Sequence, residues 1–265
     1  MLHEKGKAQT AEEIQKMAVR IVATNPAGNR LQLIGGFRYR FLDNSPRRSN
    51  DIDYHTDGEL EDKRDKLISL FERTLLPEVK RSLGYEGDVR TADGPGDDST
   101  VVKRLELAFY KTATAYSRIE IPVEVTRVAI TDKPQSRAVD GTVMLTVSNQ
   151  DMVESKVIAL VNRRVVEARD FVDIFLYRNQ LAGDSRNRLE EKLKQAGLTG
   201  EALASRLARL ESRREVDIRN IAAVLQQQVD EQVRQALEAG GGAGQVHDTV
   251  MSTVTELIAP LKEIG

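Results

Sequence analysis

The sequence has 265 residues, enough for one large or two medium domains, and its 40% hydrophobic and 30% charged residues are ordinary for a soluble protein. It contains no cysteine, which excludes disulfides, thiolate zinc sites and a cysteine nucleophile and fits a reducing cytoplasm. No apolar run approaches the ~18 residues of a membrane span, and a net charge of -2 argues against a wholly basic nucleic-acid binder. The N-terminus also lacks a signal-peptide core, so we expect a cytoplasmic protein with no membrane segment.

The N-terminal half alternates between helix and strand patterns. Thr10 and Glu13 form a capping-box pattern ahead of an amphipathic helix. The elements predicted next are a short strand in "RLQLIGG" (30–36), a brief helix in "FRYRFLDN" (37–44), a strand in "DIDYH" (51–55) and a helix over 60–80. Strands follow over about 86–92 and 101–110, separated by a polar, glycine-rich loop (Thr91 to Thr100), then in "YSRIEIPVEVTRVAI" (116–130) and "GTVMLTVS" (141–148).

The C-terminal half shows only helix patterns. The predicted helices span about 150–163, 167–180, 186–196, 201–213, 215–238 and 246–262, with the glycine-rich stretch "AGGGAG" before the last one. We therefore predict an α/β domain over residues 1–148 and an all-helical domain over residues 149–265. The expected fold is a mixed, twisted sheet of about five or six strands with flanking helices, followed by a helical bundle.

Two aspartates in the second of these strands carry the first chemical signal. Asp51 and Asp53 are two residues apart on a strand, so their carboxylates project from the same face. Carboxylates so close repel each other unless a cation or a proton compensates them, and magnesium prefers such oxygen ligands. A third carboxylate from a neighbouring strand would complete the site, and "IEIPVEV" offers Glu120 and Glu124 on one face.

A glycine pair, Gly35-Gly36, lies where the first strand passes into a helix. Free backbone N–H groups at such a position, and the missing side chains, admit a phosphate chain closely. A phosphate cradle with metal-binding carboxylates indicates metal-assisted phosphoryl or nucleotidyl transfer. Taken singly, a glycine pair is usually a turn and an Asp-x-Asp pair is often a solvated strand edge, so the prediction depends on their order and spacing.

The run "GG…RRSNDID" resembles the first signature of the AbiEii/AbiGii-type toxins of type IV toxin–antitoxin systems, within the DNA polymerase beta-like minimal nucleotidyltransferases. The matching residues are Arg47, Ser49, Asp51 and Asp53. A second signature of that family resembles "ESKVIALVNRRVVEARDFVDIF", with Glu154, Lys156, Arg169, Asp170 and Asp173 as its matching residues. The resemblance covers residues from about 30 to 177.

The resemblance implies a nucleotidyltransferase-like fold and the transfer of a nucleoside monophosphate from an NTP to an acceptor. It further implies a toxin in a toxin–antitoxin or phage-defence system, with RNA, above all tRNA, as acceptor and a cognate antitoxin as partner. The implied metal ligands for Mg²⁺ or Mn²⁺ are Asp51, Asp53 and Glu124, which with Lys156 and Asp170 form the catalytic set. The implied NTP-binding residues are Gly35, Gly36, Arg38, Arg47, Ser49 and Lys156.

The chain departs from the family pattern directly after the glycine pair. Phe37 and Arg38 stand where the family usually has Ser or Thr followed by Ala, so a hydroxyl contact to the terminal phosphate is lost. Two alternatives therefore stay open, a small-molecule nucleotidyltransferase of the antibiotic-inactivating kind and a degenerate, non-catalytic nucleotide-binding protein. For an RNA acceptor, the arginines between Arg38 and Arg48 and between Arg163 and Arg169 are the expected phosphate contacts. The sequence indicates no oligomeric state.

Overall fold

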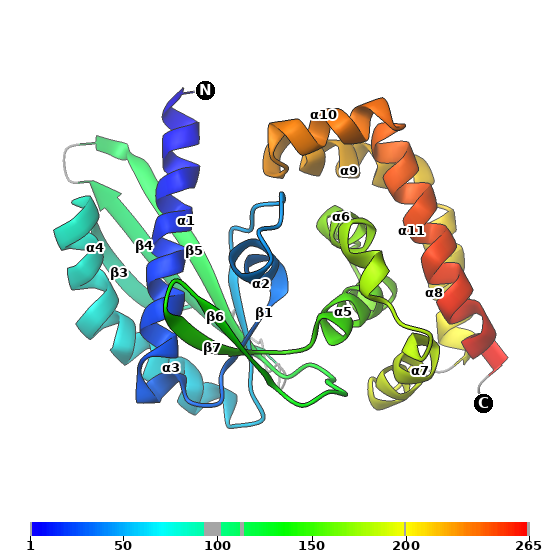
Figure 1. Cartoon of the computed structure of the whole chain (residues 1–265), viewed down its shortest axis with the longest axis horizontal. Helices are drawn as coiled ribbons and strands as arrows, with labels where there is room; N and C mark the ends of the chain where they lie inside the picture. Colours follow the sequence, from blue (N-terminus) through cyan, green and yellow to red (C-terminus); the bar gives the residue numbers. More distant parts are fainter. Residues whose placement is uncertain (1, 93–101, 112–113, 199, 264–265) are drawn as a thin grey trace. The chain divides into compact units, whose positions relative to one another are not determined.

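The computed structural model describes residues 2–92, 102–111, 114–198 and 200–263, and these form two compact units (Figure 1). Unit 1 comprises Met1–Ser45, Ser49–Val128 and Pro134–Val147, and unit 2 comprises Pro46–Arg48, Ala129–Lys133 and Ser148–Gly265. Two short segments of the N-terminal half thus belong to unit 2. The predicted loop Thr91 to Thr100 lies, from residue 93 onward, outside the described residues.

Unit 1 is built on a mixed seven-stranded sheet with the strand order β3-β4-β5-β2-β1-β7-β6. Its elements are α1 (Leu2–Ala23), the 3-10 turn η1 (Pro26–Gly28), β1 (Gln32–Ile34), α2 (Gly35–Leu42), β2 (Ile52–His55), α3 (Leu60–Leu70), the π-helical turn η2 (Phe71–Leu75), α4 (Leu76–Leu83), β3 (Glu86–Thr91), β4 (Val102–Lys111), β5 (Thr114–Thr126), β6 (Gln135–Val139) and β7 (Thr142–Thr146). Strand β2 is antiparallel to β1 and parallel to β5, which confirms the mixed sheet predicted from the sequence.

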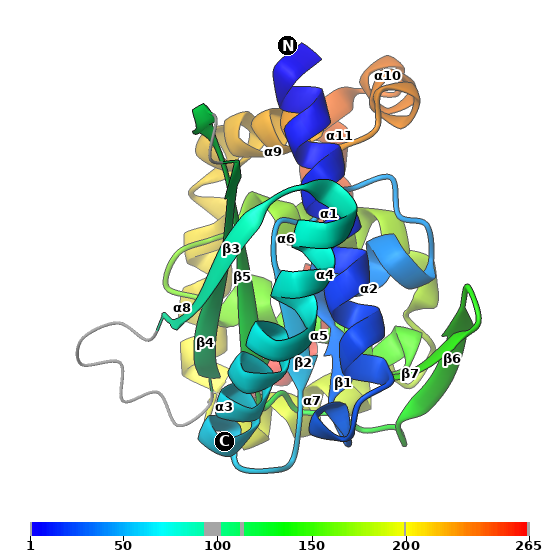
Figure 2. The same ribbon diagram turned by 90° about the vertical axis from the view of Figure 1, so that its left-hand side faces the viewer.

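The two faces of the sheet differ because side chains alternate along each strand. On β5, Ile121 and Val123 are buried, whereas Glu120 on the opposite face is half exposed. Helices α1, α3 and α4 pack against the apolar face and form the core of unit 1 with it (Figure 2). On β2, Ile52 and Tyr54 face this core, so Asp53 belongs to the polar face.

Two details of unit 1 differ from the sequence prediction. Strand β6 was not predicted, because its half-exposed residues show no apolar alternation and it pairs only with β7. The helix predicted over 60–80 is α3 and α4 joined by the π-helical turn η2. Pro77 follows this turn at the start of α4 and has no amide hydrogen to donate to the preceding helical turn, which favours an irregularity there.

Unit 2 is helical. Its elements are α5 (Asn149–Asn162), α6 (Ala168–Tyr177), the 3-10 turn η3 (Arg178–Gln180), α7 (Ser185–Gln195), α8 (Gly200–Glu211), α9 (Arg214–Gln228), α10 (Glu231–Ala239), α11 (Gly242–Ile258) and the 3-10 turn η4 (Ala259–Glu263). Apolar residues from α5, α6, α7, α8, α9 and α11 form a second core. None of the helices in the described residues is both long and apolar enough to cross a membrane.

The helix predicted over 215–238 is interrupted between α9 and α10. The backbone N–H of Arg48 donates to Gln228 O at 2.8 Å, and that of Asp230 donates to Pro46 O at 2.9 Å. Arg47 and Val229 therefore form an isolated antiparallel bridge. Backbone groups of Gln228 and Asp230 thus form hydrogen bonds with the segment Pro46–Arg48 instead of within a continuous helix. No local sequence pattern predicts this break.

Candidate active site

Strand β2 brings the predicted site residues of unit 1 together. In the antiparallel β1–β2 pair, Asp53 lies opposite Ile34, the residue before Gly35. In the parallel β2–β5 pair, Asp53 lies opposite Glu124. Directly paired residues of neighbouring strands have their side chains on the same face and close together. The glycine pair and two of the predicted metal ligands therefore gather around one position of the sheet.

Gly35 makes room for the Asp53 carboxylate. It has a φ of +77°, and a Cβ atom built on it would lie 1.8 Å from Asp53 Oδ2. Only glycine is compatible with both facts. Gly35 is also the first residue of α2, whose N-terminus receives no hydrogen bond from a capping side chain. The helix dipole and the N–H groups at this end favour negative charge, here the Asp53 carboxylate.

Gln15 of α1 holds the segment that leads into β2. Its Nε2 group donates to the backbone oxygens of Ser49 at 3.0 Å and of Asp51 at 3.4 Å. The Ser49 hydroxyl in turn donates to Asp51 Oδ1. The sequence prediction missed Gln15. Its signal would have been a polar residue beside Ile14, where the amphipathic helix turns its apolar face inward.

Strand register distinguishes the two candidate third carboxylates. Glu124 lies beside Asp53 and forms an ion pair with Arg104 Nε at 2.9 Å, in which both side chains are about one-third exposed. Glu120 lies farther along β5 and pairs with Arg118 at 2.7 Å. Glu124 is therefore the glutamate that neighbours the aspartates, and Arg104 is a neighbour that the sequence prediction missed.

The three predicted metal ligands have the chemistry that a hard divalent cation prefers, and Asp53 and Glu124 lie side by side on the sheet. Asp51, Asp53 and Glu124 offer only carboxylate oxygens, which magnesium and manganese prefer. Among the described residues, however, no three acidic or histidine side chains converge closely enough to hold a metal ion. The predicted ligands do not converge because two of them contact other side chains: Glu124 forms an ion pair with Arg104, and Asp51 accepts a hydrogen bond from Ser49.

The two departures from the family pattern have structural contacts inside unit 1. Phe37 is fully buried in the core and stacks on Phe41 with 5.7 Å between ring centroids. Arg38 is also fully buried, donates from Nε to Thr146 Oγ1 at 3.2 Å and forms an ion pair with Asp43. Neither side chain occupies the space beside Gly35 that Asp53 fills.

Three residues of the second signature, Lys156, Asp170 and Asp173, form a largely buried charge cluster in unit 2 together with Arg47 and Arg163. Lys156 Nζ lies 3.0 Å from Asp170 Oδ1 and 3.1 Å from Asp173 Oδ2. Arg47 binds Asp173 with two hydrogen bonds of 2.6 and 2.9 Å and also donates to Arg48 O and Gln228 Oε1. Arg163 reaches Asp170 at 2.8 Å. We call these five residues the Lys156 cluster.

Opposite charges dominate the ionisation of this cluster. Burial opposes the charged form of Lys156, but Asp170 and Asp173 outweigh it and raise the pKa of Lys156 above its ordinary value. Burial likewise opposes the charged form of Asp173, yet Arg47 and Lys156 hold the pKa of Asp173 below its ordinary value. Both groups therefore stay charged near neutral pH.

Glu154, the acidic residue of the second signature, belongs to a different buried network. It accepts hydrogen bonds from Arg188 at 2.9 Å and from Lys192 at 2.7 Å, and both cations also bind Asp151. Asp151 further accepts the backbone N–H of Asp132 at 3.0 Å. These contacts fix α5 to α7 and to residues 129–133 within unit 2. The sequence prediction missed Arg188 and Lys192, although they flank Leu189 on the buried face of α7.

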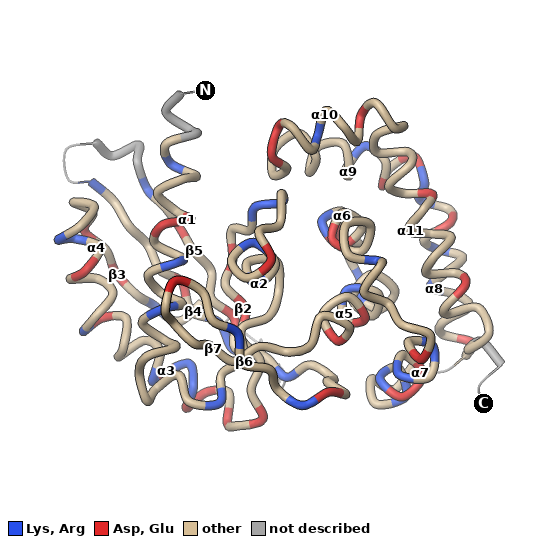
Figure 3. Tube along the Cα trace, in the orientation of Figure 1, with Lys and Arg blue, Asp and Glu red and all other residues tan. Residues whose placement is uncertain are grey.

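Basic and acidic residues are interspersed along most elements of both units (Figure 3). One arginine group around the end of α5 is an exception. Arg206 Nη1 donates to Asn162 O at 2.8 Å, and Arg209 Nη2 donates to Arg163 O at 2.8 Å, so α8 caps the C-terminus of α5. Within the described residues, no carboxylate pairs with Arg164, Arg206 or Arg209. With Arg163 they form what we call the α5–α8 arginine group.

A family model and several solved structures resemble this chain. The model "Nucleotidyl transferase AbiEii toxin, Type IV TA system" matches residues 19–240. A candidate nucleotidyltransferase from Helicobacter pylori is 14% identical, with a TM-score of 0.54 over 97% of this chain and 96% of its own. JHP933 from Helicobacter pylori is 14% identical, with a TM-score of 0.51 over 97% of this chain and 94% of its own.

MenT4, a nucleotidyltransferase toxin from Mycobacterium tuberculosis H37Rv, is 17% identical, with a TM-score of 0.51 over 69% of this chain and 63% of its own. At such identities the solved structures show the shared fold alone. No curated protein matches the chain. The family match spans most of the sequence and includes both signatures. The chain therefore belongs to the AbiEii family of nucleotidyltransferase toxins of type IV toxin–antitoxin systems, and it is a nucleotidyltransferase.

Proposed function

We propose that the chain transfers a nucleoside monophosphate from an NTP to RNA in a reaction that depends on Mg²⁺ or Mn²⁺. The observation that supports the metal site most strongly is the register of β2. It sets Asp53 beside Glu124 on one side and beside the glycine-bearing end of β1 on the other. The resemblance of both signatures to those of the AbiEii family supports the same metal-dependent chemistry. It also implies that the transferred group is a nucleoside monophosphate.

The proposed roles follow from these positions. Asp51, Asp53 and Glu124 would hold the metal, which would supply positive charge to stabilise the reacting phosphate oxygens. The N–H groups of Gly35 and Gly36 bind the phosphate chain at the start of α2. The acceptor hydroxyl oxygen attacks the α-phosphorus and gives its proton to Glu124, while the bond to the β-phosphate breaks and pyrophosphate leaves. Ser49 keeps Asp51 oriented through its hydroxyl.

The cations divide into two kinds in this proposal. Lys156 offsets negative charge on the leaving pyrophosphate, and Asp170 orients its ammonium group. Arg47 and Arg38 are assigned positioning roles instead of phosphate contacts. The guanidinium of Arg47 is engaged by Asp173 and Gln228, and that of Arg38 by Asp43 and Thr146.

The α5–α8 arginine group supports RNA as the acceptor. Its arginines lie within unit 2 and three of the four lack a carboxylate partner among the described residues, so they favour a polyanion. A cationic aminoglycoside would be repelled by the same group. The predicted stretch from Arg38 to Arg48 offers fewer phosphate contacts, because Arg38 and Arg47 are buried. We therefore favour RNA over a cationic small molecule.

A salt series with labelled RNA tests the acceptor. Arg164→Glu combined with Arg206→Glu is expected to weaken RNA binding and to flatten the dependence of log K on log salt, with NTP binding unchanged. Arg81→Glu is the matched control, since Arg81 is an exposed arginine paired with Glu78 on α4. Equal losses in both variants, or an unchanged salt slope in the double variant, would remove RNA as the acceptor at this surface.

The family membership also implies an antitoxin partner, and we propose that this chain is the growth-arresting component of such a pair. Expression of the wild-type chain in a bacterial host is expected to arrest growth, while Asp53→Asn expressed to the same level is not. Arrest by both proteins would show that toxicity does not come from nucleotidyl transfer.

A further inference from the structure

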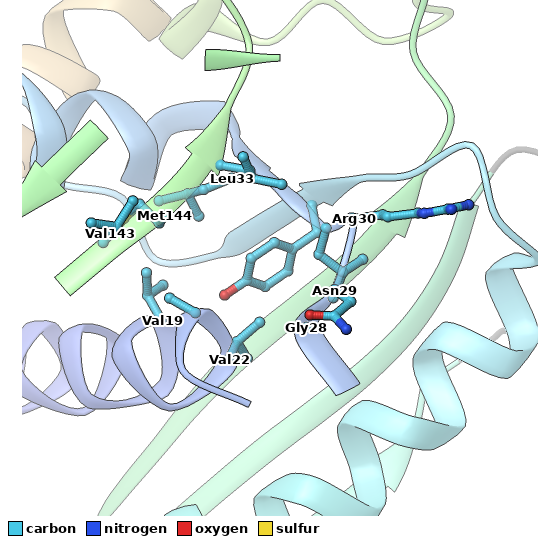
Figure 4. Close-up of a pocket in the computed structure, with 12 residues that line it drawn as sticks. Val19, Val22, Gly28, Asn29, Arg30, Leu33, Val143 and Met144 are labelled. Atoms are coloured by element: carbon cyan, nitrogen blue, oxygen red, sulfur yellow. The ribbon is translucent and has the colours of Figure 1, made fainter. Parts of the chain in front are cut away.

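A partly open pocket of about 200 Å³ lies on the helix-covered face of the sheet in unit 1 (Figure 4). Its walls come from α1, from the turn before β1, and from β1, β2 and β7. The lining residues that matter here are Val19, Val22, Leu33, Tyr54, Val143 and Met144. None of the residues assigned to catalysis above lines this pocket, and most of the residues that line it are apolar.

The Tyr54 hydroxyl is the unusual feature of this wall. Tyr54 is 2% exposed, and its hydroxyl has no hydrogen-bond partner among the described residues. A phenolic hydroxyl is an O–H group that can donate a hydrogen bond. A buried donor without an acceptor is costly, by about 1–3 kcal/mol in proteins. An acceptor placed in the pocket would remove that cost.

The rest of the pocket favours an uncharged occupant. Val143 is 59% exposed, so apolar surface is accessible at this wall. The side chain of Arg30 also borders the pocket but extends away from Leu33 and Val19 (Figure 4). No charged group is thus directed among the apolar residues, and an ion there would lack compensation. An apolar cavity of about 150 Å³ accommodates benzene, so this volume suits one ring with a short substituent.

The pocket lies directly behind the strands that carry the candidate active site. Leu33 and Tyr54 are paired in the β1–β2 ladder, and the next pair is Ile34 with Asp53. An occupant that touches Leu33 and Tyr54 on the core face therefore contacts the chain neighbours of Asp53 and Ile34. A displacement of this ladder is transmitted along the backbone by one residue, because adjacent residues share a peptide plane.

We propose that this pocket binds a small, neutral, single-ring molecule whose hydrogen-bond acceptor engages the Tyr54 hydroxyl. Binding in the pocket displaces the backbone at Asp53. None of the residues that the proposed function assigns to the NTP or to the acceptor lines this site. An uncharged metabolite bound there would contact β1 and β2 on the face of the sheet opposite Asp53.

A pair of isosteric probes tests the hydrogen bond. Acetophenone carries a carbonyl where α-methylstyrene carries a methylene group, so the two differ in the acceptor and little in shape. Each is titrated into the full chain while the methyl resonances of Val19, Leu33 and Val143 are followed. We expect acetophenone to bind about three- to tenfold more tightly than α-methylstyrene, as one added hydrogen bond predicts.

Two variants separate the site from non-specific binding. Tyr54→Phe keeps the ring and removes the donor, so it is expected to bind the two probes equally. Ala23→Leu fills the pocket from α1 and is expected to bind neither. Melting curves establish that both variants are folded, and if Tyr54→Phe is not, discrimination between the probes by the wild-type chain alone decides the hydrogen bond.

The amide resonances of Ile34 and Asp53 test the coupling, and they require no catalytic activity. They are expected to move with the same midpoint as the methyl groups. Methyl shifts without these amide shifts would overturn the coupling. Absence of methyl shifts up to the solubility of both probes, or equal binding of both by the wild-type chain, would overturn the site and leave a pocket that holds water.

Discussion

The two signatures put similar charged residues into opposite electrostatic situations. In unit 1, Asp53 and Glu124 lie side by side on a partly exposed sheet face, and the contact of Glu124 with Arg104 is about one-third exposed. In unit 2, Lys156, Asp170 and Asp173 neutralise one another in a buried cluster that Arg47 completes. The difference teaches that the carboxylates of the first set are partly exposed and only partly compensated, whereas the charges of the second set already compensate one another.

The largest expected effect on transfer comes from the two aspartates of the first signature. Asp51→Asn and Asp53→Asn should each lower nucleotidyl transfer at least about a thousandfold, since a metal ligand contributes several kcal/mol of transition-state stabilisation. The melting temperature should not fall, because each change removes repulsion between neighbouring carboxylates. Initial rates and thermal melts measure the two quantities.

Glu124→Gln and Glu120→Gln provide the matched pair for the third carboxylate. Register predicts that the first variant loses transfer and that the second retains it. The reverse pattern would show that β5 contributes a different carboxylate from the one beside Asp53.

The next largest effect is expected at Lys156 in unit 2. Lys156→Ala should lower kcat about a hundredfold with little change in KM, because the ammonium acts on charge that develops in the transition state. It should also cost about 1–3 kcal/mol of unfolding free energy, since Asp170 and Asp173 each lose a buried charged hydrogen bond while Arg163 and Arg47 remain bound to them. Lys156→Arg should restore part of the stability but little of the rate. A stable, active alanine variant would refute both statements.

Asp173→Asn should affect stability more than chemistry. Arg47 would lose a bidentate partner in a buried position, at about 3–5 kcal/mol. The pKa of Asp173 is lowered, so its stabilising contribution is present above the unfolded value near 3.8 and is lost as pH falls through the folded pKa. Denaturant titrations from pH 5 to pH 2 should therefore show a steeper loss of stability for the wild-type chain. Parallel curves would contradict the cluster.

A smaller effect is expected at Gln15. Gln15→Leu would leave the carbonyl oxygens of Ser49 and Asp51 without this donor, at about 1–3 kcal/mol. Transfer should fall about tenfold, because Asp51 then has a less fixed backbone. Thr10→Val on the same helix is the control, since Thr10 bonds only to the backbone of α1. Similar losses of rate in both variants would show a general effect of α1.

The smallest effect is expected at Arg104, which competes with a metal for Glu124. Arg104→Gln should tighten Mn²⁺ binding by no more than about fivefold, as partly exposed ion pairs contribute about 0.2–1 kcal/mol. Isothermal titration of the two proteins measures this. Weaker Mn²⁺ binding in the variant would show that Arg104 supports the carboxylate instead of restraining it.

Local patterns predicted much of the molecule. The mixed sheet, the helical half and both signatures follow from periodicity, glycine placement and motif order, and the family match confirms the resemblance. The choice between Glu120 and Glu124 was not predictable from the residues alone. Both lie on one face of β5, and only the register with β2 decides which one lies beside Asp53.

The partners of the charged residues were the part that the sequence did not reveal. Arg47 binds Asp173, and Glu154 binds Lys192, across long stretches of chain. Such pairs depend on tertiary packing, and an arginine in a motif looks the same whether it contacts phosphate or a buried carboxylate. The break at Val229 has the same origin, because the hydrogen bonds that replace helix come from Pro46–Arg48.

The most direct test of the central claim is a comparison of two labels in one reaction. The chain is incubated with RNA and with NTPs carrying ³²P at either the α- or the γ-position, with Mg²⁺, with Mn²⁺ or with EDTA. We predict that RNA acquires the α-label and never the γ-label, that EDTA prevents this, and that Asp53→Asn shows no transfer. Label transferred from the γ-position, or transferred equally by Asp53→Asn or in EDTA, would contradict metal-dependent nucleotidyl transfer at this site.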